Sequence, residues 1–423
     1  QGTQGSRLIA RPAATTQGQR ARLRLDFLGA MLASPSPLLD GPDVRVRDVL
    51  DRAAGAAPDE LAADPVALAD TLVTLGLTYY RIADHAAGEA QFRAAILLCR
   101  GQADGALDDT LSLALGGLTA LLTDTGRLDE ARAAVEEALA ISRRLHGERS
   151  LRAAEHLSAL GIVVARSGDR ERAEALFREA LALQTELLGP DDPATIGTML
   201  SLAAVLDAPP RDEAEALMRA GIAALRPHVA AGREGQRLAS ALRNLAVLLS
   251  QTGRREEAVA ALREALEVGL AACGEEHPDV AATRALLGLL LESQGDEAGA
   301  VEQLSAAVPA LRRMSPASDA QLGVALVHLG TLLAGFDRMD EAEGVLREAL
   351  ETNRRVGGPL GEGTVQSVSV LSAVLVAVGR KAEAKTMLEE LAAEARQAGP
   401  AGAMVAFRCQ QVLDQLANDE GGG

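Results

Sequence analysis

The chain has 423 residues, a formal net charge of −17 and an apolar content of 48%. The negative charge argues against a nucleic-acid partner, because binding phosphates requires clustered lysine and arginine. No run of about 18 uncharged apolar residues and no secretory signal peptide occurs in it, so we expect no membrane segment here.

Residue usage is unusual in two respects. Aromatic residues make up only 2% of the chain and tryptophan is absent, so the core must consist of closely packed Ala, Leu and Val. Arginine is abundant whereas lysine occurs only at Lys381 and Lys385, which indicates a GC-rich bacterial genome. The cysteines Cys99, Cys273 and Cys409 lie far apart and are predicted to be unpaired.

The N-terminal part precedes a regular pattern. Residues 1–20, with Gly, Gln, Thr and Pro, are predicted to be a flexible lead-in. Residues 21–66 are predicted to be a helical segment, with a helix around 23–32, a break at Ser34–Pro37 and a second run from Asp43 to Ala54. The chain begins without methionine, so we expect it to be a fragment or processed piece of a longer protein.

Residues 67–397 repeat one pattern eight times. The residues that close the first helix of each copy are Ala83, Gly126, Gly168, Pro209, Gly253, Gly295, Asp337 and Gly379, at steps of 43, 42, 41, 44, 42, 42 and 42 residues. A small residue follows five positions later and a bulky one nine positions later. Apolar residues at helical spacing make each copy two helices joined by a short turn. A fixed period of this length predicts a solenoid, in which each copy packs on its neighbours.

Small residues in the first helices are predicted to let the paired helices approach closely, while the bulky residue of the second helix fills the space beside them. They are Gly76, Gly161, Ala246, Gly288 and Gly330. These are packing positions, not catalytic ones.

The third copy shows the pattern as Leu157, Leu160, Gly161, Gly168, Ala173, Phe177 and Ala180. This pattern resembles the tetratricopeptide repeat family, whose usual unit is about 34 residues. The longer second helix and the connection Cys273–Asp279 resemble its kinesin-light-chain subtype. The resemblance implies an all-α, right-handed α-solenoid of about eight helix-turn-helix repeats with N- and C-terminal capping helices. The pattern is weakest in the fourth copy, where Pro209–Pro210 replaces the glycine turn.

The C-terminal part is predicted to end the stack. Residues 398–418 are predicted to hold a capping helix, with Val405, Cys409, Val412 and Leu416 on one side, because the last repeat needs its apolar face covered. Residues 419–423 are predicted to be a disordered tail.

The segment before the repeats also resembles a known arrangement. Its Phe27-Leu28, Met31-Leu32 and Val44-Arg45-Val46 pattern is similar to the segment that precedes the repeats in bacterial membrane-anchored serine/threonine protein kinases. That resemblance implies a kinase domain in cis in a longer parent. The chain itself contains no kinase motif, no phosphate-binding loop, no His-Glu-x-x-His and no Gly-x-Ser-x-Gly, so we predict that it is not an enzyme.

We expect no cofactor and no metal. The cluster Cys273, Glu275, Glu276 and His277 has the residue types of a zinc site, but its counterpart Gly189–Pro193 has no Cys or His, which favours a structural loop. The remaining histidines are isolated and are predicted to be surface or packed side chains: His85, His146, His156, His228 and His328.

Function must then come from surfaces. In the tetratricopeptide family the concave face, lined by the first helices, is the main binding surface, and here its predicted positions are mostly small and apolar, Val73, Ala285 and Val327 among them. Our candidate binding residues there are Tyr80, Arg166, Arg243 and Asn244. Apolar anchors of a peptide would suit this face, although several of its positions could instead pack against the next repeat. Carboxylates of the second helices, such as Glu136-Glu137, are interpreted as a solvated face, the alternative being attraction of a basic partner.

Two functions follow. The first is a non-enzymatic scaffold whose groove binds a peptide or protein segment. The second is the sensory or docking region of a bacterial serine/threonine kinase whose catalytic domain is absent from this chain. The first predicts a cytoplasmic protein, and the second a location on the extracytoplasmic side of a membrane.

Overall fold

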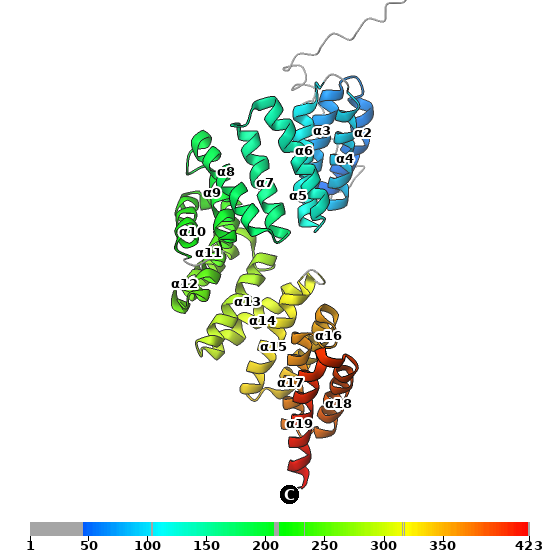
Figure 1. Ribbon diagram of the computed structural model, residues 1–423, viewed down its shortest axis with the longest axis vertical. Helices are drawn as coiled ribbons and strands as arrows, with labels where there is room; N and C mark the ends of the chain where they lie inside the picture. The colour runs from blue at the N-terminus through cyan, green and yellow to red at the C-terminus, as the bar shows by residue number, and fades with distance from the viewer. Residues whose placement is uncertain are drawn as a thin grey trace, which may run out of the picture. The chain divides into compact units, whose positions relative to one another are not determined.

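The computed structural model describes residues 45–102, 105–206, 211–231, 233–314, 316 and 318–421, and these form helices and connections without any strand. The predicted all-α fold is therefore confirmed (Figure 1). The predicted lead-in 1–20 and the predicted helix around 23–32 lie outside the described residues.

The chain divides into two compact halves, an N-terminal half Gln1–Ala214 and a C-terminal half Glu215–Gly423. Helices of the N-terminal half are α2 (Val46–Glu60), α3 (Pro65–Arg81), α4 (His85–Arg100), α5 (Asp108–Asp124), α6 (Leu128–His146), α7 (Leu151–Arg166), α8 (Arg170–Leu188) and α9 (Pro193–Val205). Helix α10 (Asp212–Leu225) contains the division. The C-terminal half continues with the 3₁₀ helix η1 (Arg226–Ala231), α11 (Arg233–Gln251), α12 (Arg255–Cys273), α13 (Pro278–Ser293), α14 (Glu297–Arg313), α15 (Asp319–Gly335), α16 (Met339–Gly357), α17 (Glu362–Ala377), α18 (Lys381–Gln397), the 3₁₀ helix η2 (Gly399–Gly402) and α19 (Ala403–Gly421).

The helices from α3 to α18 follow one another as eight pairs, as the repeat count predicted. Seven pairs pack within one half: α3 with α4, α5 with α6, α7 with α8, α11 with α12, α13 with α14, α15 with α16, and α17 with α18. The division between the halves falls in the remaining pair, α9 and α10, which is the copy with the weakest repeat pattern. Its Pro209–Pro210 turn lies outside the described residues.

Each described turn inside a pair contains one residue with a left-handed backbone. The seven predicted closing residues that the structure describes have φ values between 60° and 91°. Five of them are glycines, which adopt this conformation without a Cβ clash. The other two are Ala83, with φ of 60°, and Asp337, with φ of 61°. The predicted register of the turns is thus confirmed at seven of eight copies.

The predicted close contact between paired helices is also present. A Cβ added at Gly161 of α7 would lie 2.7 Å from Cε1 of Phe177 on α8, so only glycine fits there. The same contact joins Gly76 to Phe92, Gly288 to Leu304 and Gly330 to Leu346. Because each contact leaves no space for a methyl group, it fixes how far apart the two helices lie.

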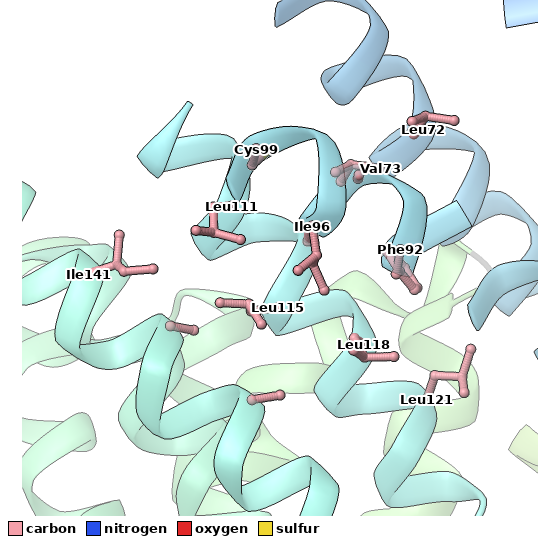
Figure 2. Close-up of a cluster of buried hydrophobic side chains, with 14 of the residues drawn as sticks. Leu72, Val73, Phe92, Ile96, Cys99, Leu111, Leu115, Leu118, Leu121 and Ile141 are labelled. Atoms are coloured by element: carbon pink, nitrogen blue, oxygen red, sulfur yellow. The ribbon is translucent and has the colours of Figure 1, made fainter. Parts of the chain in front are cut away.

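Figure 2 shows the resulting core in the N-terminal half, where Phe92, Ile96, Leu115 and Leu118 lie among α3, α4 and α5. Phe92 is fully buried and its ring occupies the space left by two glycines, Gly76 and Gly117. Each large ring requires glycines on the facing helices, so few aromatic side chains fit in a core of this kind.

Both ends of the stack are covered. At the N-terminal end, Leu50, Ala53 and Ala57 of α2 pack on α3, and Tyr79 Oη donates a hydrogen bond to Asp51 Oδ1 at 2.7 Å. At the C-terminal end, α19 packs on α18 through Cys409, Leu413 and Leu416. The two capping helices are therefore present as predicted.

Helix α19 is longer than predicted. It runs to Gly421, into the segment 419–423 that was predicted to be a disordered tail, while residues 422 and 423 lie outside the description. Gly421 lies 42 residues after the closing residue Gly379, so α19 stands at the register of a first helix. Its exposed Asp414 takes the place of the small contact residue, Ser372 in α17, and provides no close contact for another helix.

Charged side chains of the second helices link neighbouring repeats. Arg127 donates to Glu89 of the preceding repeat at 2.7 Å and to Glu130 at 2.6 Å, and Arg93 bonds the same two carboxylates at 2.9 and 3.2 Å. We call this arrangement the four-charge cluster. It recurs at Glu215, Arg219, Arg254 and Glu257, and at Glu343, Arg347, Arg380 and Glu383. The carboxylates Glu136 and Glu137, predicted to lie on a solvated face, are also paired, with Arg172 at 3.4 Å and Arg100 at 2.6 Å.

A polar network is buried between α5, α6 and α7. Ser112 Oγ lies 2.8 Å from His156 Nε2 and 2.8 Å from Ser142 Oγ. Burial, together with repulsion from Arg152, lowers the pKa of His156 to about 4. His156 is therefore a packed, neutral imidazole, in line with the prediction for the isolated histidines.

Replacing Gly161 by Ala should lower the free energy of unfolding by about 1 to 3 kcal/mol, because the new methyl group collides with the Phe177 ring. The matched control is Gly344→Ala on α16, where a Cβ meets nothing within 4 Å. This control should be neutral or gain up to about 1 kcal/mol from helix propensity. Thermal and urea melts measure both, and equal stability of the two variants would contradict the contact.

Replacing Ala83 by Gly should stabilise the fold by about 0.5 to 1 kcal/mol, because alanine is strained at a positive φ. The control Ala90→Gly lies in exposed, helical α4 and should lose about 0.5 to 1 kcal/mol. Urea denaturation that moved both variants in the same direction would rule out the left-handed turn.

The buried His156 makes stability depend on pH. Its pKa is about 4 when folded, against 6.5 for an ordinary histidine, so between these values the unfolded chain binds the extra proton. The stability that neutral His156 contributes is complete above pH 6.5. It is lost as the pH falls, so that the free energy of unfolding is lower by about 2 to 3 kcal/mol at pH 4.5. Denaturation at pH 7.5 and 4.5 should show a smaller pH effect in His156→Gln. The control His146→Gln, at an exposed histidine, should keep the wild-type dependence of stability on pH. If both variants keep the full dependence, His156 is not its source.

Candidate functional site

One position of the first helices recurs as an exposed or half-exposed, mostly apolar residue. It lies six residues before the closing residue, at Leu77, Ala120 and Ile162 in the N-terminal half and at Val247, Leu289, Thr331 and Ala373 in the C-terminal half. Leu77 and Ile162 are 39% and 41% exposed, which is high for such side chains in a repeat stack. We call the surface around this row the first-helix face.

Other positions predicted for this face pack inside the stack instead. Val73, Ala285 and Val327 are all buried, and Val73 belongs to the same core cluster as Leu111 and Leu115. The alternative that some groove positions pack against the next repeat therefore applies to these three.

In the N-terminal half, two candidate residues meet through a third. Tyr80 Oη donates a hydrogen bond to Asp124 Oδ2 at 2.5 Å, and Arg166 Nη1 lies 3.7 Å from Asp124 Oδ1. The three side chains come from the C-terminal ends of α3, α5 and α7. Burial and the hydrogen bond to Asp124 raise the pKa of Tyr80, so its hydroxyl stays protonated. Arg166, with a side chain 47% exposed and a long ion pair, presents its charge to solvent.

Asp124 was not among the sequence-based candidates. Its register could have identified it, because Asp124 and Arg166 each stand two residues before a closing glycine, Gly126 and Gly168. Residues at one register position of neighbouring first helices lie on the same face, so opposite charges there come close together.

In the C-terminal half, Arg243 of α11 is tied to the start of α13. Its Nη1 donates to Asp279 Oδ1 at 3.0 Å and to the Asp279 carbonyl oxygen at 3.2 Å, and the side chain is only 19% exposed. Burial opposes ionisation of Asp279, but hydrogen bonds from Gln236 and Arg243 and the Arg243 charge outweigh it and lower its pKa. Asn244 is exposed beside it. Arg243 therefore positions α13 as well as bordering the first-helix face.

Two depressions lie along α13, and together we call them the α13 groove. The larger, of about 510 Å³, is bordered by Arg243 and Asp279 at one end, by Met314, and by Val324 of α15. The smaller, of about 330 Å³, lies towards α11 and contains Val247, Ser250, Gln251 and Arg255. Leu286 and Leu289 line both depressions and form the ridge between them. Val324 is 46% exposed and Val247 39%, so apolar surface is open to solvent on each side.

The loop with metal-like residues has a structural role. His277 caps α13 by accepting a hydrogen bond at Nδ1 from the Asp279 backbone N–H at 3.2 Å. Glu275 pairs with Arg284 at 2.9 Å and Glu276 with Arg313 at 3.4 Å. Within the residues that the structure describes, no group of three or more His, Cys, Asp or Glu side chains is arranged to hold a metal ion. In the same residues, no helix has the length and apolar character needed to cross a membrane.

Comparison with protein families identifies the repeats. A tetratricopeptide repeat model matches residues 109–186, which span α5 to α8, and residues 237–313, which span α11 to α14. In these two ranges the chain therefore matches tetratricopeptide repeats, as predicted from the register. A model described as anaphase-promoting complex subunit 5 matches residues 294–357. A search of curated proteins finds no significant match.

Two solved structures with TM-scores above 0.5 show the same fold at low sequence identity. The apo form of the quorum sensor NprR from B. thuringiensis has 11% identity and a TM-score of 0.55, covering 88% of this chain and 97% of that one. A Rap protein complexed with competence and sporulation factor has 12% identity and a TM-score of 0.52, covering 87% and 89%. A Podosopora anserina putative kinesin light chain with nearly identical TPR-like repeats has 19% identity and a TM-score of 0.38, covering 49% and 98%. None of these similarities concerns a kinase, so the predicted kinase domain in cis stays a prediction.

Proposed function

We propose that this tetratricopeptide-repeat chain is a non-enzymatic scaffold that binds a peptide or protein segment on its first-helix face. The observation that carries the proposal is the α13 groove, where two apolar depressions are separated by the Leu286 and Leu289 ridge. Concave, mostly apolar sites with a few polar groups are the usual form of ligand sites. Such a pair of depressions suits two apolar side chains of one peptide.

The ends of the groove indicate what else the peptide would carry. One end holds the Arg243–Asp279 pair and the other the polar side chains of Ser250, Gln251 and Arg255. At the first end Arg243 is neutralised by Asp279, and at the second Arg255 carries the charge. We therefore infer that recognition depends on apolar anchors, with polar groups fixing orientation.

The comparisons support a peptide as the ligand class. The Rap protein of similar fold is described in complex with competence and sporulation factor, and NprR is described as a quorum sensor. At 11% and 12% identity these similarities concern the fold alone. The argument for binding in this chain therefore depends on its own groove.

The candidate residues Tyr80 and Arg166 are proposed as a separate contact in the N-terminal half. Arg166 is exposed, and Asp124 holds it only through a 3.7 Å ion pair. Its guanidinium could receive a carboxylate from a bound segment without breaking a buried interaction. Arg243 and Asn244 are proposed as border residues of the α13 groove, with Asn244 supplying an exposed amide.

Val324→Glu should weaken peptide binding at least tenfold, because it places a charge in the larger depression. The probe is a displayed library of random peptides selected on the full chain, followed by fluorescence anisotropy of the enriched peptides. The control is Val356→Glu, an exposed valine on α16 outside the groove, which should leave affinity unchanged.

Enrichment of peptides with two apolar residues that lose affinity only for Val324→Glu would support the proposal. Selection that yields no enriched peptide, or peptides that bind both variants alike, would contradict it. Arg166→Glu tests the N-terminal contact separately and should reduce the affinity of enriched peptides that carry a carboxylate. Arg243 is better replaced by Gln than by Glu, because a carboxylate beside Asp279 would disturb the start of α13.

A further inference from the structure

A second apolar cleft lies among α4, α5 and α6 of the N-terminal half. Its volume is about 500 Å³, its floor is formed by leucines of α5, and α4 and α6 form its two lips. Leu115 and Leu118 of this floor are visible with Ile96 in Figure 2. Leu97, on the α4 lip, is 76% exposed, which is the highest value among the large apolar side chains that the structure describes.

The lips carry opposite charges. Arg93 and Arg100 stand seven residues apart on α4, and Glu130 and Glu137 stand seven residues apart on α6. Arg93 meets Glu130 at 3.2 Å and Arg100 meets Glu137 at 2.6 Å. All four side chains are exposed, so each pair contributes little on its own, and the Arg100–Glu137 pair, which lies outside the four-charge cluster, can exchange partners at low cost.

The same cleft recurs in the C-terminal half, among α10, α11 and α12. Comparing the two clefts shows which lining residues the helix packing requires. Each of its eleven lining residues stands 126 or 127 residues after a residue of the first cleft, and ten of the eleven are of the same type. The single difference is Ala223, which stands where the first cleft has Leu97. Alanine therefore satisfies the helix packing at this position, and the exposed leucine requires another explanation.

We propose that the cleft of the N-terminal half is a self-association site, where two copies of the chain meet about a two-fold axis. Leu97 of each copy enters the cleft of the other. In a two-fold contact the same patch faces itself, so the patch must complement itself. The oppositely charged lips do so, because the arginine lip of one copy faces the glutamate lip of the other.

The depth of the cleft fits this occupant. Its walls include Ala133 and Ala134 on the α6 lip, small residues that leave room for an inserted leucine between the two Arg–Glu pairs. The C-terminal copy of the cleft has the depression and the charges but no protruding leucine. It therefore does not form the same reciprocal contact, which makes it a matched control within the chain.

Leu97→Arg should raise the dissociation constant of the dimer at least tenfold, while Ala223→Arg should change it less than twofold. The measurement is the concentration dependence of molar mass of the full chain by sedimentation equilibrium. Both positions are exposed, so circular dichroism melts should match the wild type. A wild-type chain that stays monomeric at the highest soluble concentration, or an equal effect of the two variants, would overturn the proposal.

A second measurement does not depend on an introduced charge. In a two-fold contact the two Leu97 side chains lie near each other, so Leu97→Cys should form a cross-linked dimer with a short bis-maleimide. Ala223→Cys should cross-link no more than the wild-type chain. If Leu97→Cys cross-links no more than the wild-type chain, the proposal is overturned. The same holds if Leu97→Cys cross-links only to an added, unrelated amphipathic helical peptide and not to a second copy of the chain.

Discussion

The contact between a small residue of the first helix and a bulky residue of the second is the constraint on which the rest depends. At Gly161 and Phe177 the two helices are so close that no methyl group fits between them. The distance between paired helices is therefore set by one side chain and the absence of another. Once this distance is fixed, the same helix faces point outward in every repeat, which produces the recurring first-helix face.

The first and second helices of each repeat have different roles in the stack. Charges on the second helices are used between repeats, as Arg127 shows by holding carboxylates of two consecutive repeats. The first helices pack through their buried side, and the row from Leu77 to Ala373 on their other side is free to vary. Substitutions along this row can therefore alter ligand selectivity without disturbing the ion pairs between the second helices.

The register of the sequence was sufficient for the helix pairs, the turns and the close contacts, because these depend on residues within one repeat, such as Gly161 and Phe177. It did not reveal that Asp124 joins Tyr80 to Arg166 or that Asp279 neutralises Arg243. Those pairs connect helices of neighbouring repeats, about 36 to 44 residues apart, and depend on which way each side chain leans. The extension of α19 to Gly421 was missed because the last residues of the chain are polar and rich in glycine.

The four-charge cluster recurs with a longer period than the repeat itself. It is complete between the first and second repeats, between the fourth and fifth, and between the seventh and eighth. The two clefts with matching linings are separated by the same three repeats. A period of three repeats is therefore superimposed on the period of one, so that equivalent clefts and charge clusters stand about 126 residues apart rather than at every helix pair.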